Sequence, residues 1–580
     1  MNNIKVLFPY LKIYRIRYLA GFLCLILVDA AQMLIPQYIK NAVNIITSGA
    51  FEFKQILYIS LLMIGTMFII ASGRFLWRYF IHGSSRRIET ALRGRLFSHL
   101  LCLSDDFYQR NKIGDLMARA TNDAGAVRMA VGWGLVGLVD GTIMMAVILI
   151  IIFVQNGQTA ALAVMPLPFI TLLIVLFGKA IGPRFMKAQA AYSNMSDAVQ
   201  ESFAGSRVIK SFVKENFFVN NFAAANDEYK ETNLNVVRLH GFFFPFVTFL
   251  SGLTMLIVTY AGGMRVMLGT MTAGGFVALF SYIQMLIWPV FGAGFTVNMI
   301  QRGLVSLKRI NEILSTEPSV KSEVEFAPAG WKENTGLPVI EFRNVSFSYI
   351  PGKPALSNIS FSLPAGKWLG ILGRTGAGKS TLLKLITRLE DPPHNSVFVY
   401  GVCVHSIPLP ALRGIFAVSP QDSYLFSDTI RNNILYGTDG SASDSGISSI
   451  ISLAALDRDI AEFVEGDAAL IGERGLTLSG GQKQRLSIAR AAIMEAEVLM
   501  LDDSLSACDA DTERRILTAL AESRRGKTTV IVSHRISAFR NADYVAVLEN
   551  GALTEFGAPQ ELLKTGGFYA QTARLQQLSV

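Results

Sequence analysis

The sequence predicts an all-α membrane domain of six transmembrane helices, followed by a soluble α/β domain. Three observations lead to this fold class. Nearly all long apolar segments lie before residue 305. Hydrophobic residues make up 51% of the 580 residues and charged residues only 17%, against roughly 25% charged residues in soluble proteins. After residue 338, strand-like and helix-like segments alternate around a glycine-rich loop at 373–381.

Six apolar segments are each long enough to cross the hydrocarbon core of a bilayer, which takes about 20 helical residues. The alternative, six helices inside a large soluble core, would need more surrounding protein than the chain supplies. The first segment follows basic residues, as in a signal peptide, but it is too long and lacks a small-residue cleavage site, so we interpret it as a retained span. The six segments are 18–46, 56–81, 127–154, 159–181, 242–267 and 274–300.

The loops between these segments alternate in length and charge. Short loops without Lys or Arg are expected at 47–53, 155–158 and 268–273. The loops at 82–126 and 182–241 are long and basic, so the positive-inside rule predicts that they and both termini lie in the cytoplasm. We expect the spans to continue into the cytoplasm as long helices with short helices at their tips.

Polar residues within the spans are candidates for substrate contact. Asp29 lies in the first span and Asp140 in the third; an intramembrane carboxylate either packs inside the helix bundle or contacts a substrate, and both roles fit Asp29. A face of the sixth span that includes Leu286 and Val297 is expected to contact lipid. The opposite, mixed polar and aromatic face is predicted to line a substrate cavity and consists of Gln284, Trp288, Phe291, Phe295 and Asn298.

The loop Gly373–Thr381 has the G-x-x-x-x-G-K-S pattern of a P-loop, with an apolar strand before it and a helix after it. Backbone N–H groups of such a loop, together with the helix N-terminus, surround phosphate groups. Lys379 is predicted to reach the β- and γ-phosphates and Ser380 to bind Mg²⁺. The chain is therefore expected to bind a nucleoside triphosphate.

The composition divides the chain into three parts: a transmembrane domain over 1–314, a polar linker over 315–338 and a soluble domain over 339–580. The net charge of +9 comes from Lys and Arg clusters at the ends of apolar segments, which predicts a membrane topology and no nucleic-acid partner. Four Cys residues stand far apart without metal-ligand spacing, so we expect them to be reduced.

Several short motifs after residue 339 follow the order found in ABC ATPases. The segment 478–485, LSGGQKQR, resembles the signature motif, and 498–502, VLMLD, resembles the Walker B strand. The segment 504–509 resembles the D-loop and 472–475 a motif of exporters in this family. The Q-loop residue, the switch histidine and the aromatic residue that stacks on adenine correspond to Gln421, His534 and Tyr349. With its six spans, nearly the whole chain resembles a half-transporter of the bacterial multidrug-exporter type, with the type I/type IV exporter fold.

This resemblance implies ATP-driven export of amphipathic small molecules across the bacterial plasma membrane, with ATP and Mg²⁺ bound. It implies catalytic roles for Asp503, His534, Gln421 and Lys379, and Mg²⁺ coordination by Ser380, Gln421 and Asp502. The signature motif would close over the nucleotide of a second half-transporter, so the chain would act as a dimer. The residues implied in ATP binding are Tyr349, Gly373, Arg374, Thr375, Gly376, Ala377, Gly378, Lys379, Ser380, Thr381, Ser479, Gly480, Gly481 and Gln482.

One residue departs from the family pattern. The family carries Glu, the general base, after the Walker B aspartate, whereas this chain has Asp503. The combination of Asp503 with an intact signature resembles the degenerate-site subunit of a heterodimeric exporter; a homodimer that tolerates Asp is the alternative. Two further alternatives are a lipid or peptide flippase, and an ATP-gated channel or regulatory subunit that hydrolyses little ATP. The six spans exclude a soluble ABC ATPase.

Overall fold

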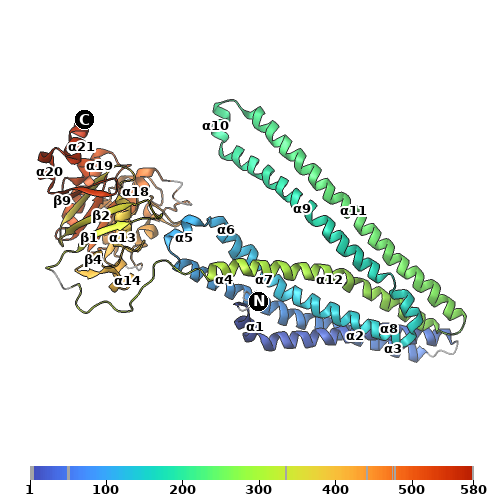
Figure 1. Ribbon diagram of the computed structural model, residues 1–580. Coiled ribbons are helices and arrows are strands. Elements are labelled where there is room, and N and C mark those ends of the chain that lie inside the picture. Colours follow the sequence, from blue (N-terminus) through green and yellow to red (C-terminus); the bar gives the residue numbers. More distant parts are fainter. Residues whose placement is uncertain are drawn as a thin grey trace. The chain divides into compact units, whose positions relative to one another are not determined.

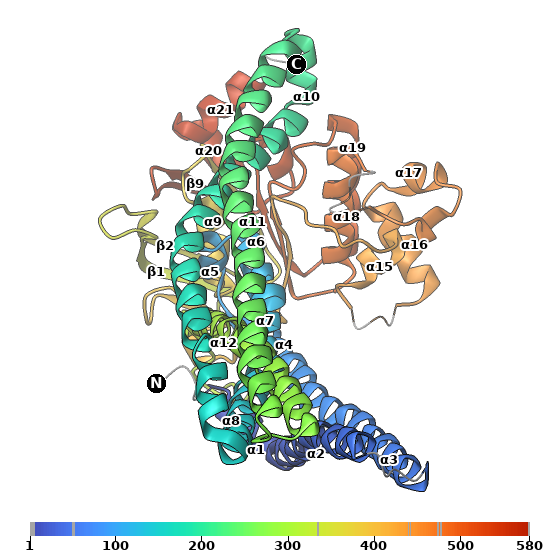
Figure 2. The same ribbon diagram turned by 90° about the vertical axis from the view of Figure 1, so that its right-hand side faces the viewer.

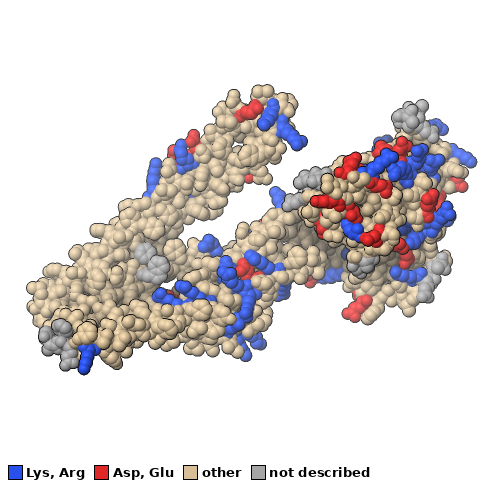
Figure 3. Space-filling view, turned by 180° about the vertical axis from the view of Figure 1, so that it is seen from behind, with Lys and Arg blue, Asp and Glu red and all other residues tan. Residues whose placement is uncertain are grey.

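The computed structural model describes residues 6–48, 53–332, 336–438, 440, 442–472, 475 and 478–577. It divides into two compact units, Met1–Leu101 with Asn111–Thr316, and Cys102–Arg110 with Glu317–Val580. The first unit is helical and the second contains two β-sheets (Figure 1). Lys, Arg, Asp and Glu are dense on the second unit, whereas much of the helical unit shows none of them (Figure 3). This distribution fits a membrane unit and a water-exposed unit.

Six helical segments of the first unit are long and apolar enough to cross a membrane, which confirms the six predicted spans. As expected, several continue far beyond their apolar part. Helix α11 has 53 residues, which is roughly 80 Å at 1.5 Å per residue. The helices of this unit are α1 Phe8–Ile13, α2 Arg15–Thr47, α3 Phe53–Trp77, α4 Gly83–Cys102, α6 Ile113–Ala118, α7 Ala124–Met129, α8 Leu135–Val164, α9 Leu167–Ala204, α10 Ser206–Ser211, α11 Glu215–Met267 and α12 Ala273–Leu314, with π-helical turns at Arg78–His82, Arg119–Asp123 and Ala130–Gly134.

The predicted loop at 155–158 is wrong. Helix α8 continues through these residues to Val164, and the chain turns at Met165 and Pro166 before α9 begins. A single glycine costs a helix only about 1 kcal/mol, so the polar segment around Gly157 does not end it. Proline lacks a backbone N–H and is favoured in the first turn of a helix, which places the boundary at Pro166.

Two groups of helices are recognisable in the first unit. Helix α12 packs against α2 and α8, and the Tyr282 hydroxyl of α12 donates a hydrogen bond to the Met33 carbonyl of α2 at 2.7 Å. Helices α9 and α11 run side by side as a long hairpin whose tip is α10 (Figures 1 and 2). Gly205 separates α9 from α10, a short helix at the tip of the kind that we expect from the sequence.

The second unit contains a four-stranded antiparallel sheet, ordered β2-β1-β4-β5, and a six-stranded sheet, ordered β10-β9-β3-β8-β7-β6. In the six-stranded sheet all pairs are parallel except β10 with β9. The strands are β1 Ile340–Phe347, β2 Leu356–Leu363, β3 Trp368–Gly373, β4 Val397–Val399, β5 Val402–Cys403, β6 Phe416–Ser419, β7 Val498–Asp502, β8 Thr528–Val532, β9 Tyr544–Glu549 and β10 Ala552–Gly557.

Strands β3, β7 and β8 are buried along their whole length, which explains their continuous apolar sequences. Alternate residues point to opposite faces, so Met500 enters one hydrophobic core with the antiparallel sheet, whereas Leu499 enters the other core with α18 and α19. The helices of this unit are α13 Lys379–Ile386, α14 Leu409–Arg413, α15 Ile430–Leu435, α16 Asp444–Leu453, α17 Asp457–Ala461, α18 Gly480–Ala492, α19 Ala510–Ser523, α20 Pro559–Thr565 and α21 Phe568–Gln577.

Helix α5, Asp105–Arg110, belongs to the second unit although it lies in the loop between the second and third spans. Its Asp105 carboxylate accepts a hydrogen bond from Lys384 Nζ of α13 at 2.8 Å. The hydroxyl of Ser319 donates to Asp106 at 3.0 Å, and the Ser104 hydroxyl accepts from the Val320 N–H at 3.0 Å. A short helix from the membrane-domain loop is thus tied directly to the helix that follows the P-loop.

Candidate functional site

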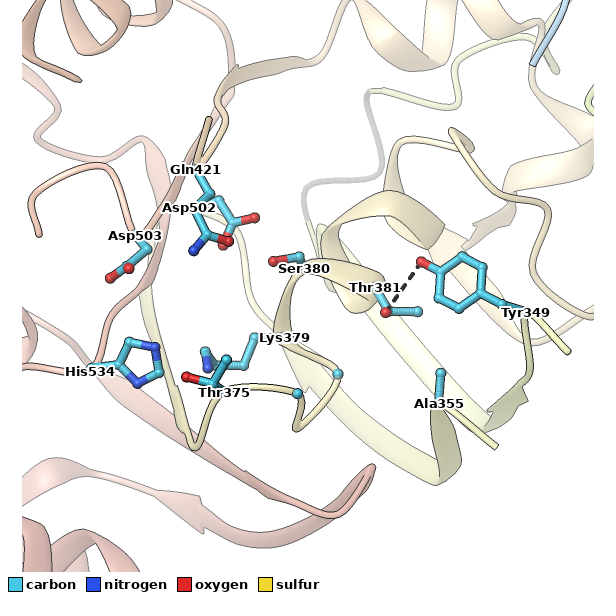
Figure 4. Close-up of a pocket in the computed structure, with 12 residues that line it drawn as sticks. Tyr349, Ala355, Thr375, Lys379, Ser380, Thr381, Gln421, Asp502, Asp503 and His534 are labelled. Atoms are coloured by element: carbon cyan, nitrogen blue, oxygen red, sulfur yellow. Dashed lines mark hydrogen bonds between the residues drawn. The ribbon is translucent and has the colours of Figure 1, made fainter. Parts of the chain in front are cut away.

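A polar cavity of about 280 Å³ lies beside the carboxyl ends of β3 and β7. The carboxyl edge of a parallel sheet is where ligands of α/β proteins bind. Figure 4 shows its lining, which gathers most of the predicted catalytic and metal-binding residues from segments far apart in the sequence. The lining residues are Tyr349, Ala355, Thr375, Gly376, Gly378, Lys379, Ser380, Thr381, Gln421, Asp502, Asp503 and His534.

The glycine-rich loop needs its glycines for two reasons. Gly376 and Gly378 have φ values of +83° and +96°, which side chains other than glycine rarely adopt. A Cβ atom on Gly378 would also lie 2.7 Å from the Ala355 carbonyl oxygen. Helix α13 begins directly after Gly378, so the first-turn N–H groups without helical partners border the cavity. This arrangement suits a phosphate group.

Lys379 is only 7% exposed, and its ammonium group donates hydrogen bonds to the carbonyls of Gly373 at 2.8 Å and Arg374 at 2.9 Å. Burial lowers the pKa of Lys379, while the nearby Asp503 and Asp502 carboxylates oppose that shift. The loop thus holds a buried cation at the edge of the cavity, where a polyphosphate chain could pair with it.

Asp502 ends strand β7 and is 8% exposed. Burial raises the pKa of this carboxyl group, and the adjacent Ser380 hydroxyl counteracts the rise. The Ser380 hydroxyl, the Asp502 carboxylate and the Gln421 amide all line the same cavity (Figure 4). These are hard oxygen donors of the kind that Mg²⁺ prefers, so the donor set fits a magnesium ion that accompanies a nucleotide.

Asp503 follows in the left-handed conformation, with a φ of +48°. Its N–H donates to the Val532 carbonyl at 3.0 Å, and its carbonyl accepts from the Ser506 hydroxyl at 2.8 Å. Aspartate tolerates this backbone conformation better than most residues. Its side chain lies on the same side of the cavity as His534 (Figure 4).

The loop of His534 is held by helix α21, which sequence reasoning missed. The Gln576 side chain donates to the His534 carbonyl at 2.7 Å and accepts from the Ile536 N–H at 2.8 Å. The Arg374 guanidinium of the P-loop lies 5.6 Å from the ring centre of Phe568 on the same helix. A glutamine near the end of a chain carries no local signal of such a role, because only the folded structure brings it to this loop.

The other residues predicted to bind ATP differ in whether they line this cavity. Tyr349 lies at its rim, 43% exposed, and its hydroxyl donates to the Thr381 hydroxyl at 3.3 Å. Gly373, Arg374 and Ala377 belong to the loop but do not line the cavity. Glu473 and Arg474 of the expected exporter motif lie outside the described residues.

The signature residues lie apart from the cavity. Ser479 caps the N-terminus of α18, where its hydroxyl accepts from the Gln482 N–H at 3.3 Å and its own N–H donates to Gln482 Oε1 at 2.8 Å. Gly480 lines a separate surface depression, and a Cβ on Gly481 would lie 2.9 Å from the Ala507 carbonyl oxygen. Gly481 therefore packs on the D-loop segment, whereas Gly480 borders open space at a helix N-terminus on the surface.

The predicted substrate residues whose side chains the structure describes differ in burial. Phe295 is 70% exposed on α12, and Gln284 and Asn298 are also exposed, whereas Asp29 of α2 is only 3% exposed. The Asp29 carboxylate has no hydrogen-bond partner among the described residues. The side chains of Trp288 and Phe291 are not among those that the structure describes. Leu286 is completely buried in a hydrophobic cluster with α2, α8 and α11, so the expectation that it contacts lipid is wrong.

Two family models match the chain. Residues 18–290 match the ABC transporter transmembrane region, and residues 356–506 match the ABC transporter model. The chain is 38% identical over 582 residues to the probable multidrug resistance ABC transporter ATP-binding/permease protein YheI of Bacillus subtilis, covering 99% of this chain and 98% of YheI. It is 35% identical to the multidrug resistance-like ATP-binding protein MdlA of Escherichia coli, covering 97% of this chain and 94% of MdlA.

A solved structure shares the fold. The structure of a bacterial Atm1-family ABC exporter with ATP bound superposes with a TM-score of 0.80 and 24% sequence identity. The match covers 97% of this chain and 99% of that one. The combination of six long helices and the two-sheet α/β unit is therefore the fold of that exporter.

Proposed function

This chain belongs to the ABC transporter family, and from that premise we propose that it is one half of a dimeric exporter that drives amphipathic small molecules across the membrane with ATP. One observation carries the proposal. Lys379, Ser380, Asp502 and His534 line a single cavity in a chain that also has six membrane-spanning helices. The relatives named for multidrug resistance support the substrate class.

The cavity residues divide into roles by their chemistry. Lys379 pairs with the β- and γ-phosphates, and Tyr349 at the rim stacks on the adenine. Ser380, Asp502 and Gln421 would hold Mg²⁺, which would supply positive charge to neutralise the phosphates. His534, next to Asp503, contacts the γ-phosphate and the water that attacks it. The P-loop glycines let the backbone approach the phosphates closely.

Two surfaces that this chain leaves exposed support a second half-transporter as its partner. Ser479 and Gly480 lie outside the chain's own cavity, so we assign them to the nucleotide held by the partner. Helices α9 and α11 also carry an apolar groove of about 410 Å³ whose lining includes Phe169, Leu172 and Leu176, each more than half exposed. An apolar surface of this kind marks a contact with lipid or with another protein chain.

We assign the partner to a different half-transporter because of Asp503. Its side chain is one methylene shorter than the glutamate that the family uses as a general base. A partner with glutamate would complete the second site together with Ser479, Gly480 and Gly481 of this chain. The two long basic loops, 82–126 and 182–241, support a cytoplasmic location for the ATPase unit and both termini by the positive-inside rule.

The test is to purify this chain through an affinity tag, identify the chain that accompanies it, and reconstitute the pair in liposomes. We expect ATP-dependent accumulation of an amphipathic fluorescent dye against its gradient, which Lys379→Ala in this chain reduces. Movement of a labelled lipid without dye accumulation would identify a flippase instead. If ATP causes the dye to move only down its concentration gradient, the protein is a channel and the proposal is overturned.

A further inference from the structure

Two histidines and a glutamate, none of which lines the nucleotide cavity, meet on the ATPase unit. Ligand atoms of Glu323, His394 and His405 all lie within 4.8 Å of one another. The two imidazole rings have centres 4.2 Å apart with planes inclined by 31°. His394 precedes strand β4, His405 lies in the 3-10 turn Val404–Ser406 after β5, and Glu323 comes from the segment that follows the last membrane helix in sequence. We propose that these three side chains bind a divalent transition-metal ion such as Zn²⁺.

The donor set has the chemistry that such an ion requires. Two imidazoles and one carboxylate form a three-ligand zinc set that leaves a fourth position for water. Metal–ligand bonds of about 2.0–2.2 Å bring tetrahedral ligand atoms to roughly 3.4 Å from each other. Because the ligand atoms lie within 4.8 Å of one another, the widest separation has to shorten by up to about 1.4 Å. His405 is 5% exposed and fixed, while Glu323 and His394 are exposed and able to make that movement.

Two carboxylates and two guanidinium groups surround the histidines. The fully buried Arg388 guanidinium lies 3.5 Å from Glu323 Oε1 and 2.8 Å from Asp391 Oδ1. The Arg413 guanidinium, which donates a hydrogen bond to the Arg388 carbonyl at 2.7 Å, balances the second carboxylate, so the charges around the histidines are evenly matched. Asp391 Oδ1 also lies 3.8 Å from His405 Nε2. A carboxylate next to a ligating histidine is a usual companion of metal sites.

A bound ion would connect two parts of the ATPase unit. Glu323 stands in the connecting segment after Thr316, whereas His394 and His405 flank the small β4–β5 hairpin. Coordination would fasten this segment to the hairpin more tightly than the ion pair of Glu323 with Arg388, because that pair is partly exposed. The metal would thus stabilise the ATPase unit and restrain the segment through which the two domains are joined in sequence.

Binding of Co²⁺ tests the site directly, because its visible absorption reports tetrahedral coordination by histidine. The full-length protein with its partner is purified in detergent through a tag without histidine and titrated with Co²⁺, then with Zn²⁺ as competitor. We expect one site in this chain, with affinity lowered at least tenfold in His394→Ala and in Glu323→Gln. The matched control is Glu325→Gln, an exposed glutamate two residues away, which should bind Co²⁺ as the unchanged protein does.

A second measurement distinguishes loss of the metal site from misfolding of a variant. Zn²⁺ should raise the melting temperature of the unchanged protein and of Glu325→Gln, but not that of His394→Ala, which replaces an exposed side chain. Co²⁺ binding of the same strength in all variants would overturn the proposal. So would the absence of tetrahedral Co²⁺ absorption in the unchanged protein, which would leave the cluster as an ion-pair network around Arg388.

Discussion

The side-chain amide of Gln576 donates a hydrogen bond to the main-chain carbonyl of His534 at 2.7 Å. The same amide accepts one from the Ile536 N–H at 2.8 Å, so a single side chain of α21 fastens both sides of the histidine loop. Because the Phe568 ring of α21 also faces Arg374 of the P-loop, this helix contacts two of the loops that surround the cavity.

From this contact we predict that Gln576→Ala loosens the histidine loop. Each lost hydrogen bond is worth about 1 kcal/mol, so amide hydrogen exchange in a peptide covering 534–536 should accelerate roughly tenfold. Peptides of the P-loop should exchange as before. Gln571→Ala on the same helix is the control, because Gln571 Nε2 donates to the nearby Gly566 carbonyl at 3.3 Å and not to the histidine loop. Equal exchange in both variants would show that Gln576 does not hold the loop.

Lys379→Ala should weaken ATP binding at this chain's P-loop by at least tenfold. The ammonium is the main cation that the loop offers to the β- and γ-phosphates, and the backbone N–H groups alone should not replace it. Photolabelling of this chain with an ATP analogue measures the loss. The control is Lys367→Ala, which removes an exposed lysine that pairs with Asp543 at 2.9 Å before β3. Labelling at wild-type affinity in Lys379→Ala would refute the assignment.

The third prediction separates the two nucleotide sites of the dimer. A general base acts from about 2.6–3.2 Å, and a misplacement of about 1 Å costs on the order of 10²-fold in rate, so Asp503 should contribute little. Asp503→Asn should therefore leave most ATP hydrolysis by the complex intact. Ser479→Arg, which places a bulky charge in the partner's site, should stop nearly all of it.

Steady-state ATP hydrolysis by the reconstituted pair decides between these outcomes. ATP binding at this chain's P-loop should be retained in both variants, which photolabelling checks. If Asp503→Asn stops turnover as fully as Ser479→Arg, then Asp503 is a working base and a homodimer is favoured.

The fourth prediction concerns pH and the ion pair between Asp105 of α5 and Lys384 of α13. The hydrogen bond from Lys384 holds the pKa of Asp105 below its ordinary range. The pair's stabilisation is therefore fully present above the ordinary Asp pKa of about 3.9 and is lost only as the pH falls through the lower folded-state value. Between pH 5 and 8, Asp105→Asn should lower the melting temperature by a constant amount.

That decrease should be small, because both partners are partly exposed. A contribution of about 0.5–1 kcal/mol corresponds to about 1–4 °C for a domain of this size. Fluorescence-monitored melting of the full-length protein in detergent measures it. Asp511→Asn, which removes a more exposed pair with Arg514, serves as the control. If the difference in melting temperature between Asp105→Asn and the unchanged protein shrinks steadily from pH 8 to pH 5, the stabilisation does not come from the ionised Asp105 carboxylate.

The sequence by itself determined the features that depend on local physical chemistry. Six apolar segments specify six spans because each must satisfy its backbone hydrogen bonds within one helix in the membrane. The P-loop is recognisable because positive φ values at Gly376 and Gly378 demand glycine, and because the strand before it is apolar enough to be buried on both faces. Every residue that lines the cavity except Ala355 belongs to a motif that the sequence itself displays.

Only the tertiary structure decided what depends on distant packing. Leu286 is buried inside the helix bundle, because the neighbouring helices and not the local sequence decide which face of α12 is covered. The same holds for Gln576 beside His534 and for Glu323 beside His394 and His405. A side chain's partner across a fold depends on where the chain returns in space, and no local pattern carries that information.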